Sequence, residues 1–222
     1  MTQTAIIDLS GSTPFAEGDN RWCFRHPYRP DRCLKIMKPG VAEALYTAMP
    51  LHKKLRGRDS ADDNLREAQG YKQTALRKAS GEPWKHLPRW HGRVQTSLGM
   101  ANETDLIREE GKPAVTLEAI LRETGLDQNV SAALQDFGHW LERTGILSRN
   151  LLPHNLVVQR ETTPWQIYLI DGLGAPPLQD LFCRIPAYRR RYLRRRIKKM
   201  WARCEWEAAG RKGSWSEVEK SV

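Results

Sequence analysis

The chain has 222 residues, a length that suits one domain or one domain built as two small lobes. Its 40% apolar and 8% aromatic content excludes an intrinsically disordered chain. The formal net charge is +10, and ten of the 36 Lys and Arg residues lie between positions 184 and 203, a segment without acids. The rest of the chain is therefore neutral, and the basic character is concentrated near the C-terminus.

The cysteines indicate thiols rather than a metal centre. Cys23, Cys33, Cys183 and Cys204 form no C-x-x-C pair, and no histidine stands at zinc-ligand spacing from them. The N-terminus "MTQTAIIDLS" lacks the basic start and apolar run of a signal peptide, and no stretch is apolar enough to cross a membrane. We therefore expect reduced thiols in a cytoplasmic protein.

The first half of the chain is predicted to be rich in strands. Two strands are expected within "RWCFRHPYRPDRCLKIM", joined by a turn at "HPYRPD". A helix that Pro50 interrupts follows, and residues 60–79 read as a clearer helix, capped by Ser60 or Asp62. "LPRWHGRVQT" and "LGMANETDLIRE" are then predicted to be two further strands.

Helices are predicted to dominate the second half. After a helix at "VTLEAILRET", the segment 129–145 has apolar residues at helical spacing and a glycine placed to end the helix. "WQIYLIDGLG" reads as a buried strand, and residues 185–208 form a basic helix with Pro186 in its first turn. One side of this helix carries apolar residues with arginines around them: Ile185, Tyr188, Tyr192, Ile197 and Trp201.

This order of elements predicts an α+β fold. We expect a single domain over 1–222 with two lobes. The strand-rich N-terminal lobe would span 5–110 and the helical C-terminal lobe 111–205, followed by a polar tail at 206–222.

Four polar residues occur in the order and on the element types that phosphoryl transfer from ATP uses. Lys35 lies in the middle of a strand, and Glu67 lies on the following helix. Asn155 precedes the apolar run "LVV", and Asp171 ends a buried strand. In kinase-like folds such residues hold the phosphates, the lysine and Mg²⁺. Each residue alone also fits a structural role, as a strand-edge lysine, a solvated helix charge, a turn asparagine or a strand-end cap.

Two further features bear on this prediction. "FAEGDNRWCF" is the candidate phosphate-covering loop, in which Gly18 permits a tight turn and Arg21 is either a phosphate contact or a surface arginine. The literal triplet Asp136-Phe137-Gly138 is a decoy, because it precedes the candidate catalytic loop and falls inside an amphipathic helix. Asp171-Gly172-Leu173-Gly174 is the better metal-binding segment.

The chain resembles the YrbL family, the PhoP regulatory network proteins of Gram-negative bacteria. The resemblance is carried by "EGDNRWCFRHP", "CLKIMK", "NLREAQGYKQ", "LPRWHGRVQTSLG", "GKPAVTLEAIL", "LLPHNLVV" and "LIDGLG". The resemblance implies a small bilobal protein-kinase-like fold, with ATP and Mg²⁺ as cofactors. It also implies that Lys35 and Glu67 are nucleotide-site positions, to which the candidate phosphate-covering loop adds Gly18 and Arg21. By the same resemblance Asn155 and Asp171 are the metal positions.

The candidate catalytic loop departs from the kinase pattern at two positions. Where a kinase has the base aspartate this chain has Asn150, and where a kinase has the loop lysine it has Leu152. Asparagine can orient a hydroxyl but cannot take its proton, and loss of a general base costs about 10²–10⁴-fold in rate. His154 is a weak substitute, because its position points away from the acceptor. Two readings stay open. One is an atypical phosphotransferase with an unknown acceptor, and the other is a pseudokinase, a binding or signalling module that keeps nucleotide affinity or only the fold, with an unknown protein partner.

The basic C-terminal helix supports a third reading, an interaction protein. Its charged face is either solvated, or bound to an anionic membrane surface, or bound to nucleic acid phosphates. The chain has no base-reading motif, so sequence-specific nucleic-acid binding is not expected. A membrane-binding helix would place a cytoplasmic protein peripherally at the inner membrane surface.

Overall fold

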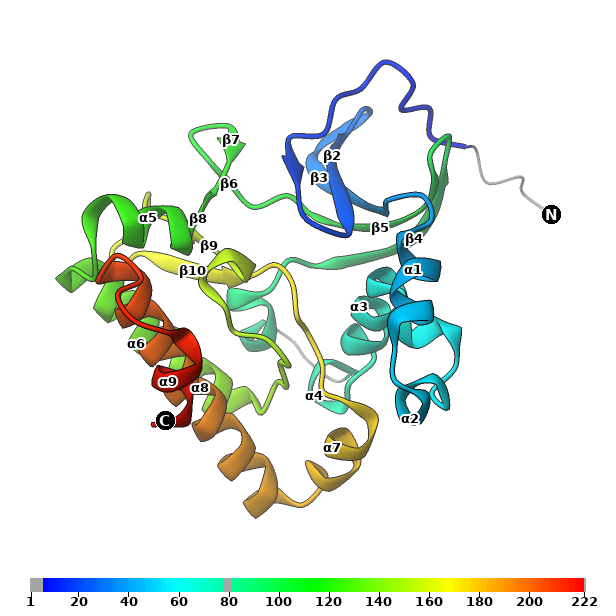
Figure 1. Cartoon of the computed structure of the whole chain (residues 1–222). Helices are drawn as coiled ribbons and strands as arrows, with labels where there is room; N and C mark the ends of the chain where they lie inside the picture. Colours follow the sequence, from blue (N-terminus) through cyan, green and yellow to red (C-terminus); the bar gives the residue numbers. More distant parts are fainter. Residues whose placement is uncertain (1–5, 78–80, 222) are drawn as a thin grey trace. The chain divides into compact units, whose positions relative to one another are not determined.

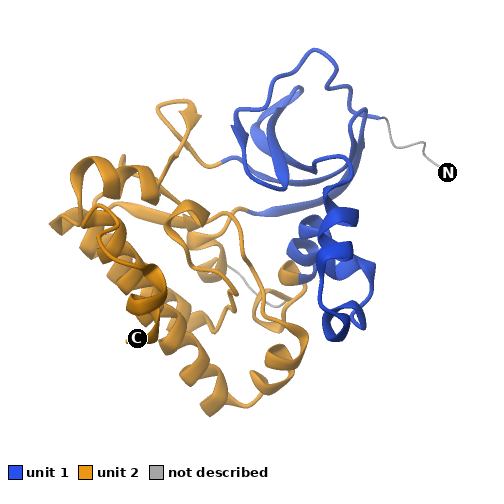
Figure 2. Cartoon of the chain, in the orientation of Figure 1, with its two compact units in different colours: residues 1–69, 89–106 blue, residues 70–88, 107–222 orange. Residues whose placement is uncertain are grey.

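The computed structural model describes residues 6–77 and 81–221, and its contacts divide the chain into two compact units (Figures 1 and 2). Unit 1 comprises residues 1–69 and 89–106, and unit 2 comprises residues 70–88 and 107–222. Residues 70–88, which lie between the two segments of unit 1 in sequence, belong to unit 2.

Unit 1 is built on a five-stranded antiparallel sheet in the order β1-β2-β3-β5-β4. The strands are β1 Ala16–Glu17, β2 Arg21–His26, β3 Arg29–Met37, β4 Trp90–Thr96 and β5 Gly99–Asp105. Alternation along β3 sends Leu34 and Ile36 into the apolar core with Phe24. The same alternation places Lys35 on the opposite face, which fixes the position of the candidate site.

The helices of unit 1 follow the predicted interruption at Pro50. They are α1 Val41–Ala48, α2 Leu51–Lys54, the 3₁₀ turn η1 Arg58–Ala61 and α3 Asp63–Tyr71. Pro50 stands immediately before α2, where its missing N–H costs nothing. Asp62, the second of the two predicted caps, accepts hydrogen bonds from the backbone N–H groups of Asn64 and Leu65.

The prediction of one continuous helix over 60–79 was wrong. The segment forms η1, α3 and the short α4 Thr74–Arg77, and residues 78–79 lie outside the described residues. The break follows Tyr71, where the carbonyl of Gly70 accepts hydrogen bonds from the backbone and the side chain of Gln73. These two bonds satisfy an orphan carbonyl of the helix end and turn the chain.

Unit 2 has a helical core around a small antiparallel sheet in the order β10-β9-β8. Its helices are α5 Leu117–Thr124, α6 Gln128–Thr144, α7 Pro177–Phe182, α8 Pro186–Ala208 and α9 Trp215–Lys220. Its strands are β6 Arg108–Glu109, β7 Lys112–Pro113, β8 Val115–Thr116, β9 Leu156–Gln159 and β10 Gln166–Leu169. Two 3₁₀ turns, η2 Glu82–His86 and η3 Pro153–Asn155, complete it.

Helix α6 is the centre of this core, as its apolar spacing predicted. Its stripe of Val130, Leu134, Phe137 and Leu141 is fully buried. The helix ends at Gly145, which adopts a left-handed φ of 68° and donates its N–H to the carbonyl of Leu141. Strands β9 and β10 and helix α8 pack against α6 and α5.

Helix α8 packs through the buried Tyr192, Leu193, Met200 and Cys204, with Ile197 and Trp201 half-buried against the core. Ile185, which precedes the helix, and Tyr188 are exposed. The reason is that α8 packs on α5 and α6, whereas its first turn contacts α7 through the rings of Phe182 and Tyr188. The predicted polar tail contains the end of α8 and helix α9, joined by an ion pair between Lys199 and Glu219. No helix within residues 6–77 and 81–221 is long and apolar enough to span a membrane.

Gly70 allows a close approach of two backbone segments within unit 2. A Cβ added at Gly70 would lie 2.7 Å from the carbonyl oxygen of Leu173. Gly138, also helical, would place its Cβ 3.5 Å from Ile197 Cγ2, an ordinary contact. The backbone at Leu173, which follows Asp171, therefore lies directly against Gly70.

This difference predicts opposite effects for the same substitution at the two glycines. Gly138→Ala should stabilise the protein by about 0.5–1 kcal/mol, because alanine favours a helix. Gly70→Ala should destabilise the protein by about 1–3 kcal/mol, because the new Cβ would force the backbone of Leu173 to move. Chemical denaturation measures both values, and equal effects of the two substitutions would contradict the close approach.

Candidate functional site

The centre of the site in unit 1 is a buried ion pair between Lys35 on β3 and Glu67 on α3. Lys35 Nζ lies 2.5 Å from Glu67 Oε1, and both side chains are more than nine-tenths buried. The sequence predicted the two residues separately, and the structure brings them together. Their role at a nucleotide stays a prediction.

Glu67 is held from three sides. Arg21 Nη1 donates to its second oxygen, Oε2, at 2.8 Å, and Asn102 Nδ2 donates to the same oxygen at 3.0 Å. Asn64 joins the set by donating to the backbone carbonyl of Lys35 and accepting from Arg21. A carboxylate with this many charge-assisted partners has a fixed orientation, and so does the lysine that it holds.

Arg21 and Gly18 occupy the hairpin that was predicted to cover phosphates. Arg21 is buried rather than on the surface, because Glu67 binds it. Gly18 donates its N–H to the carbonyl of Arg21 at 3.0 Å and so closes the turn between β1 and β2. A direct phosphate contact from either residue remains a prediction.

Two cysteines share the sheet face of Lys35. Cys23 is the direct cross-strand neighbour of Lys35 in β2, and Cys33 lies two residues before Lys35 on β3. A hydrogen bond from Cys33 lowers the pKa of Cys23 to about 7, and the positive charges of Lys35 and Arg21 act in the same direction against the effect of burial. The pKa of Cys33 is raised well above its usual value by the same hydrogen bond and by burial.

The site in unit 2 consists of the loop at 148–155. Asn155 Nδ2 donates to the backbone carbonyl of Asn150 at 3.3 Å, and the carbonyl of Asn155 accepts from the N–H of Ile170. Asn155 is buried and Asn150 is half-buried, while His154 is exposed. The amide nitrogen of Asn155 is used by the loop, so the atom it can offer to a cation is Oδ1.

The loop is fastened to the segment that begins with Asp171. Gly172 accepts hydrogen bonds at its carbonyl from Arg149 N–H at 2.9 Å and from Ser148 Oγ at 2.9 Å. Gly172 has a φ of 80°, and a Cβ there would lie 2.7 Å from the carbonyl oxygen of Asn150. Only glycine fits at this position. Its close packing against Asn150 fixes the backbone next to Asp171.

Asn155 and Asp171 have the chemistry of a magnesium site that uses few protein ligands. Asp171 Oδ1 accepts from the N–H of Gly172 at 2.6 Å, which orients the carboxylate. Across the described part of the chain, no group of three or more His, Cys, Asp or Glu side chains is placed to hold a metal. Mg²⁺ is commonly bound through one or two protein oxygens plus substrate phosphates, so this pair fits a metal that arrives with a nucleotide.

The Asp136-Phe137-Gly138 triplet has a structural role, as its sequence position indicated. Phe137 is fully buried in the α6 stripe. Asp136 forms an ion pair with Lys85 at 2.8 Å and lies 3.4 Å from His86 Nε2. Asp136 therefore ties η2 to α6.

Sequence reasoning missed the buried asparagines Asn64 and Asn102 and the role of His26. His26 Nδ1 accepts the N–H groups of Tyr28 and Arg29, which shapes the turn between β2 and β3. Burial lowers the pKa of His26, in agreement with a neutral ring that accepts at Nδ1. Nothing in a single sequence distinguishes such residues from surface polar ones, because their partners are remote in the chain.

Solved structures with a similar fold are protein kinase domains. The kinase domain of Mycobacterium tuberculosis PknI matches with a TM-score of 0.52 at 14% identity, covering 94% of this chain and 78% of that one. Rad53 1–466, solved in complex with AMP-PNP, matches with a TM-score of 0.51 at 11% identity over 94% of this chain and 51% of that one. At these identities the matches show the fold: an α+β, kinase-domain-like structure, as predicted.

Curated relatives are found at higher identity. "Uncharacterized protein YrbL" of Escherichia coli K12 is 26% identical over 181 residues, which cover 79% of this chain and 77% of the relative. The protein of the same name from Shigella flexneri matches to the same extent. The family model described as "PhoP regulatory network protein YrbL" matches residues 7–205. The chain therefore belongs to the YrbL family of PhoP regulatory network proteins and has a kinase-like fold.

Proposed function

We propose that this protein binds ATP together with Mg²⁺ and that it either transfers the γ-phosphate slowly or uses the bound nucleotide as a signal. The observation that carries the proposal is the buried Lys35–Glu67 ion pair at 2.5 Å. Rad53 in its complex with AMP-PNP gives one example of a similar fold that holds a nucleotide.

A buried ion pair is a poor way to stabilise a domain. Removing two charges from water costs several kcal/mol per ion, and the attraction between them seldom returns much more. Lys35 and Glu67 are nevertheless supported by Arg21, Asn64 and Asn102. Such an arrangement makes sense if the lysine is held in place for an anionic ligand, as the corresponding pair is in kinases.

The remaining roles are assigned by residue chemistry. Lys35 would contact the α- and β-phosphates, and Asn155 Oδ1 and the Asp171 carboxylate would hold Mg²⁺, which neutralises phosphate charge when it is bound. Arg21 and the Gly18 turn would flank the phosphates. These assignments follow the order of the kinase pattern, which this chain retains at four positions.

Asn150 and Leu152 weaken the phosphotransferase alternative. Asn150 has no charge with which to accept a proton, and Leu152 removes a positive charge from the transition state. Phosphoryl transfer through a loose transition state depends more on charge placement than on early proton removal. A slow transferase and a nucleotide-binding pseudokinase therefore both remain consistent with the residues.

Nucleotide binding is expected to depend on Mg²⁺ and on the Lys35–Glu67 pair. The double variant Lys35→Met/Glu67→Gln removes both charges of the pair, and the glutamine oxygen can still accept the hydrogen bond that Arg21 donates at this position. It should weaken ATP binding at least about tenfold, since charge-assisted contacts contribute about 1.5–3 kcal/mol. Asp171→Ala should abolish the dependence on Mg²⁺. Isothermal titration calorimetry with and without Mg²⁺ measures both effects.

Matched controls for this experiment are Lys112→Met and Asp180→Ala, two exposed charges outside the proposed site. Circular dichroism should show that every variant is folded. Unchanged ATP affinity in the double variant, or equal losses in the controls, would contradict the assignment.

Restoring the missing base should separate the two alternatives. If the protein is a slow transferase, Asn150→Asp should raise ATP turnover by about a hundredfold, the lower end of the effect of a general base. ATP affinity should change little, because the side chain acts on the acceptor. Asn150→Ala provides the control, and phosphate release provides the measurement. An absence of turnover in all three proteins would reject the transferase reading and leave nucleotide binding alone.

Cys23 provides a reporter beside Lys35. Its alkylation by iodoacetamide should rise through a midpoint at about pH 7, because the thiolate is the reactive form. Cys33→Ala should move the midpoint upward toward 9.0, the ordinary pKa of a cysteine thiol, because the hydrogen bond between Cys33 and Cys23 is lost. Mg²⁺–ATP should slow the reaction, since bound phosphates raise the pKa of the thiol. Peptide mass spectrometry measures the rate at Cys23, and a rate that saturating nucleotide leaves unchanged would place the ligand elsewhere.

A further inference from the structure

A stripe of apolar side chains is exposed on α7 and the first turn of α8. Leu178, Leu181 and Phe182 stand at positions i, i+3 and i+4 of α7, so they share one face of that helix. Ile185, the N-cap residue of α8, follows them in the link between the two helices. Tyr188 continues the stripe, with its ring 5.5 Å from that of Phe182. The five residues are between 37% and 62% exposed.

This stripe is not the packing face of the segment. An amphipathic helix normally turns its apolar stripe to the core. Helix α7, however, has no buried residue. The segment is attached through other side chains, as Cys183 packs in a small buried cluster with Leu147, Tyr192 and Leu193. The exposed stripe is therefore left for a contact outside the chain.

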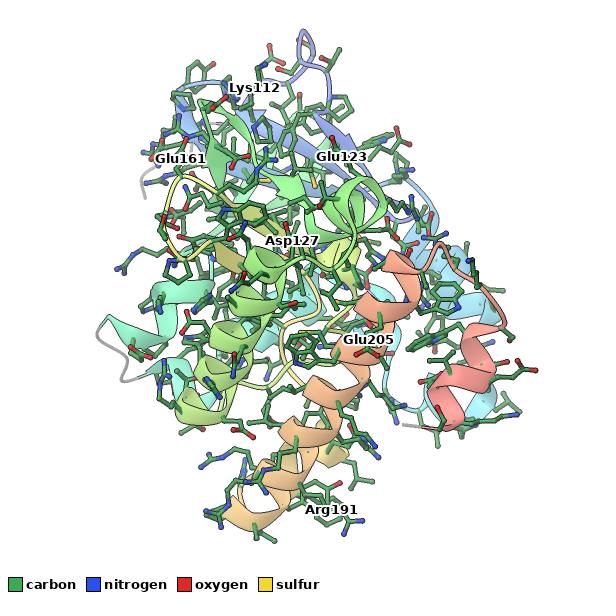
Figure 3. All side chains as sticks on the ribbon, turned by 90° about the vertical axis from the view of Figure 1, so that its left-hand side faces the viewer. Lys112, Glu123, Asp127, Glu161, Arg191 and Glu205 are labelled. Carbon is green, nitrogen blue, oxygen red and sulfur yellow. The ribbon has the colours of Figure 1, made fainter. Side chains whose placement is uncertain are left out.

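Basic side chains adjoin the stripe along α8. Tyr188, Arg191 and Arg195 stand at positions i, i+3 and i+7, which places the two arginines on the same helix face as the tyrosine. In Figure 3 Arg191 lies near one end of α8 and Glu205 near the other. The exposed basic residues of this region are Arg184, Arg190, Arg191, Arg194, Arg195 and Lys198.

Few acids balance this charge. Arg194 lies 3.3 Å from Glu142, but among the described residues no carboxylate is within ion-pair distance of Arg190, Arg191 or Arg195. Asp180 is the single acid of α7. The region is therefore strongly positive, and its positive groups surround apolar side chains.

We propose that α7 and the first half of α8 bind the surface of an anionic phospholipid bilayer. The boundary between head groups and acyl chains accepts both parts of this surface at once. Leucine, isoleucine and aromatic side chains enter the acyl boundary, while arginines contact phosphates at the level of the head groups. The same combination is typical of helices that lie in the plane of a membrane.

Other anionic partners fit less well. A nucleic acid backbone would satisfy the arginines but has no place for Leu178, Leu181 and Ile185, which cannot stack on bases. A second copy of this chain would bring the same positive segment against itself, which like-charge repulsion opposes. Binding of either partner in place of a membrane would contradict the proposal.

The test is flotation of the full chain with lipid vesicles, without nucleotide. The protein should bind phosphatidylcholine vesicles that contain phosphatidylglycerol and should not bind phosphatidylcholine alone. The triple variant Arg190→Gln/Arg191→Gln/Arg195→Gln should bind about a hundredfold more weakly, because each basic residue at a membrane contributes about fivefold. The apolar variant Leu181→Ser/Ile185→Ser should lose at least about tenfold.

The matched control is Arg93→Gln/Lys112→Gln/Lys212→Gln, which removes the same charge from exposed positions elsewhere and should bind normally. Circular dichroism verifies that all variants fold. Equal weakening in the control triple would mean general charge attraction and would overturn the proposal. Full binding by the apolar variant would also overturn the proposal. Binding would then need no apolar contact, and the surface would be purely electrostatic, as in nucleic-acid binding. Binding that appears only with self-association in analytical ultracentrifugation would assign the surface to a second copy.

Because this test uses no nucleotide and leaves Lys35 and Asp171 intact, its failure would not bear on the proposed nucleotide site. Likewise, vesicle binding without nucleotide binding would support the proposed membrane surface and contradict the proposed function.

Discussion

The ion pair between Lys35 and Glu67 is the interaction around which unit 1 is organised. It requires a strand that alternates Lys35 with the core residues Leu34 and Ile36, and it requires α3 to lie against the sheet face that carries Lys35. Asn64 and Asn102 complete the arrangement, since each joins α3 to the strands by a buried hydrogen bond. Polar networks of this kind fix one arrangement of the elements, because a partly satisfied network would be costly.

Unit 2 depends on a different constraint, the close backbone approach at its glycines. Gly70 and Gly172 each bring two backbone segments nearer than a side chain would allow. The consequence is that the loop containing Asn150 and Asn155 and the segment beginning at Asp171 are fixed to each other by hydrogen bonds. The loop thus keeps one fixed backbone arrangement even though its residues depart from the kinase pattern at Asn150 and Leu152.

The sequence predicted those features that depend on neighbours along the chain. Periodicity identified α6 and its buried stripe, and the special backbone requirements of Pro50 and Gly145 located helix ends. The order of Lys35, Glu67, Asn155 and Asp171 was also readable, because each follows a recognisable element. The α+β kinase-like fold and the YrbL family were predicted from these residues together.

The features that were missed depend on contacts between remote segments. Nothing local shows that Arg21 is buried by Glu67, or that Asn64 and Asn102 complete the network. The single helix predicted over 60–79 failed because Gln73 bonds back to Gly70. Apolar spacing also could not show that Ile185 and Tyr188 are exposed while Ile197 and Trp201 pack against the core, because spacing does not tell a core-facing stripe from an exposed one. The two exposed residues form part of the surface on which the membrane proposal rests.

The most direct test of the central claim is to observe Lys35 itself. In protein labelled with ¹⁵N-lysine, the buried ammonium group should give a distinct NMR signal that disappears in the Lys35→Met/Glu67→Gln variant. Our account predicts that Mg²⁺–ATP shifts this signal saturably while the signals of exposed lysines such as Lys112 stay in place. A Lys35 signal that remains unmoved at high ATP concentration would contradict the account, and the pair would then be a structural element of a kinase-shaped protein.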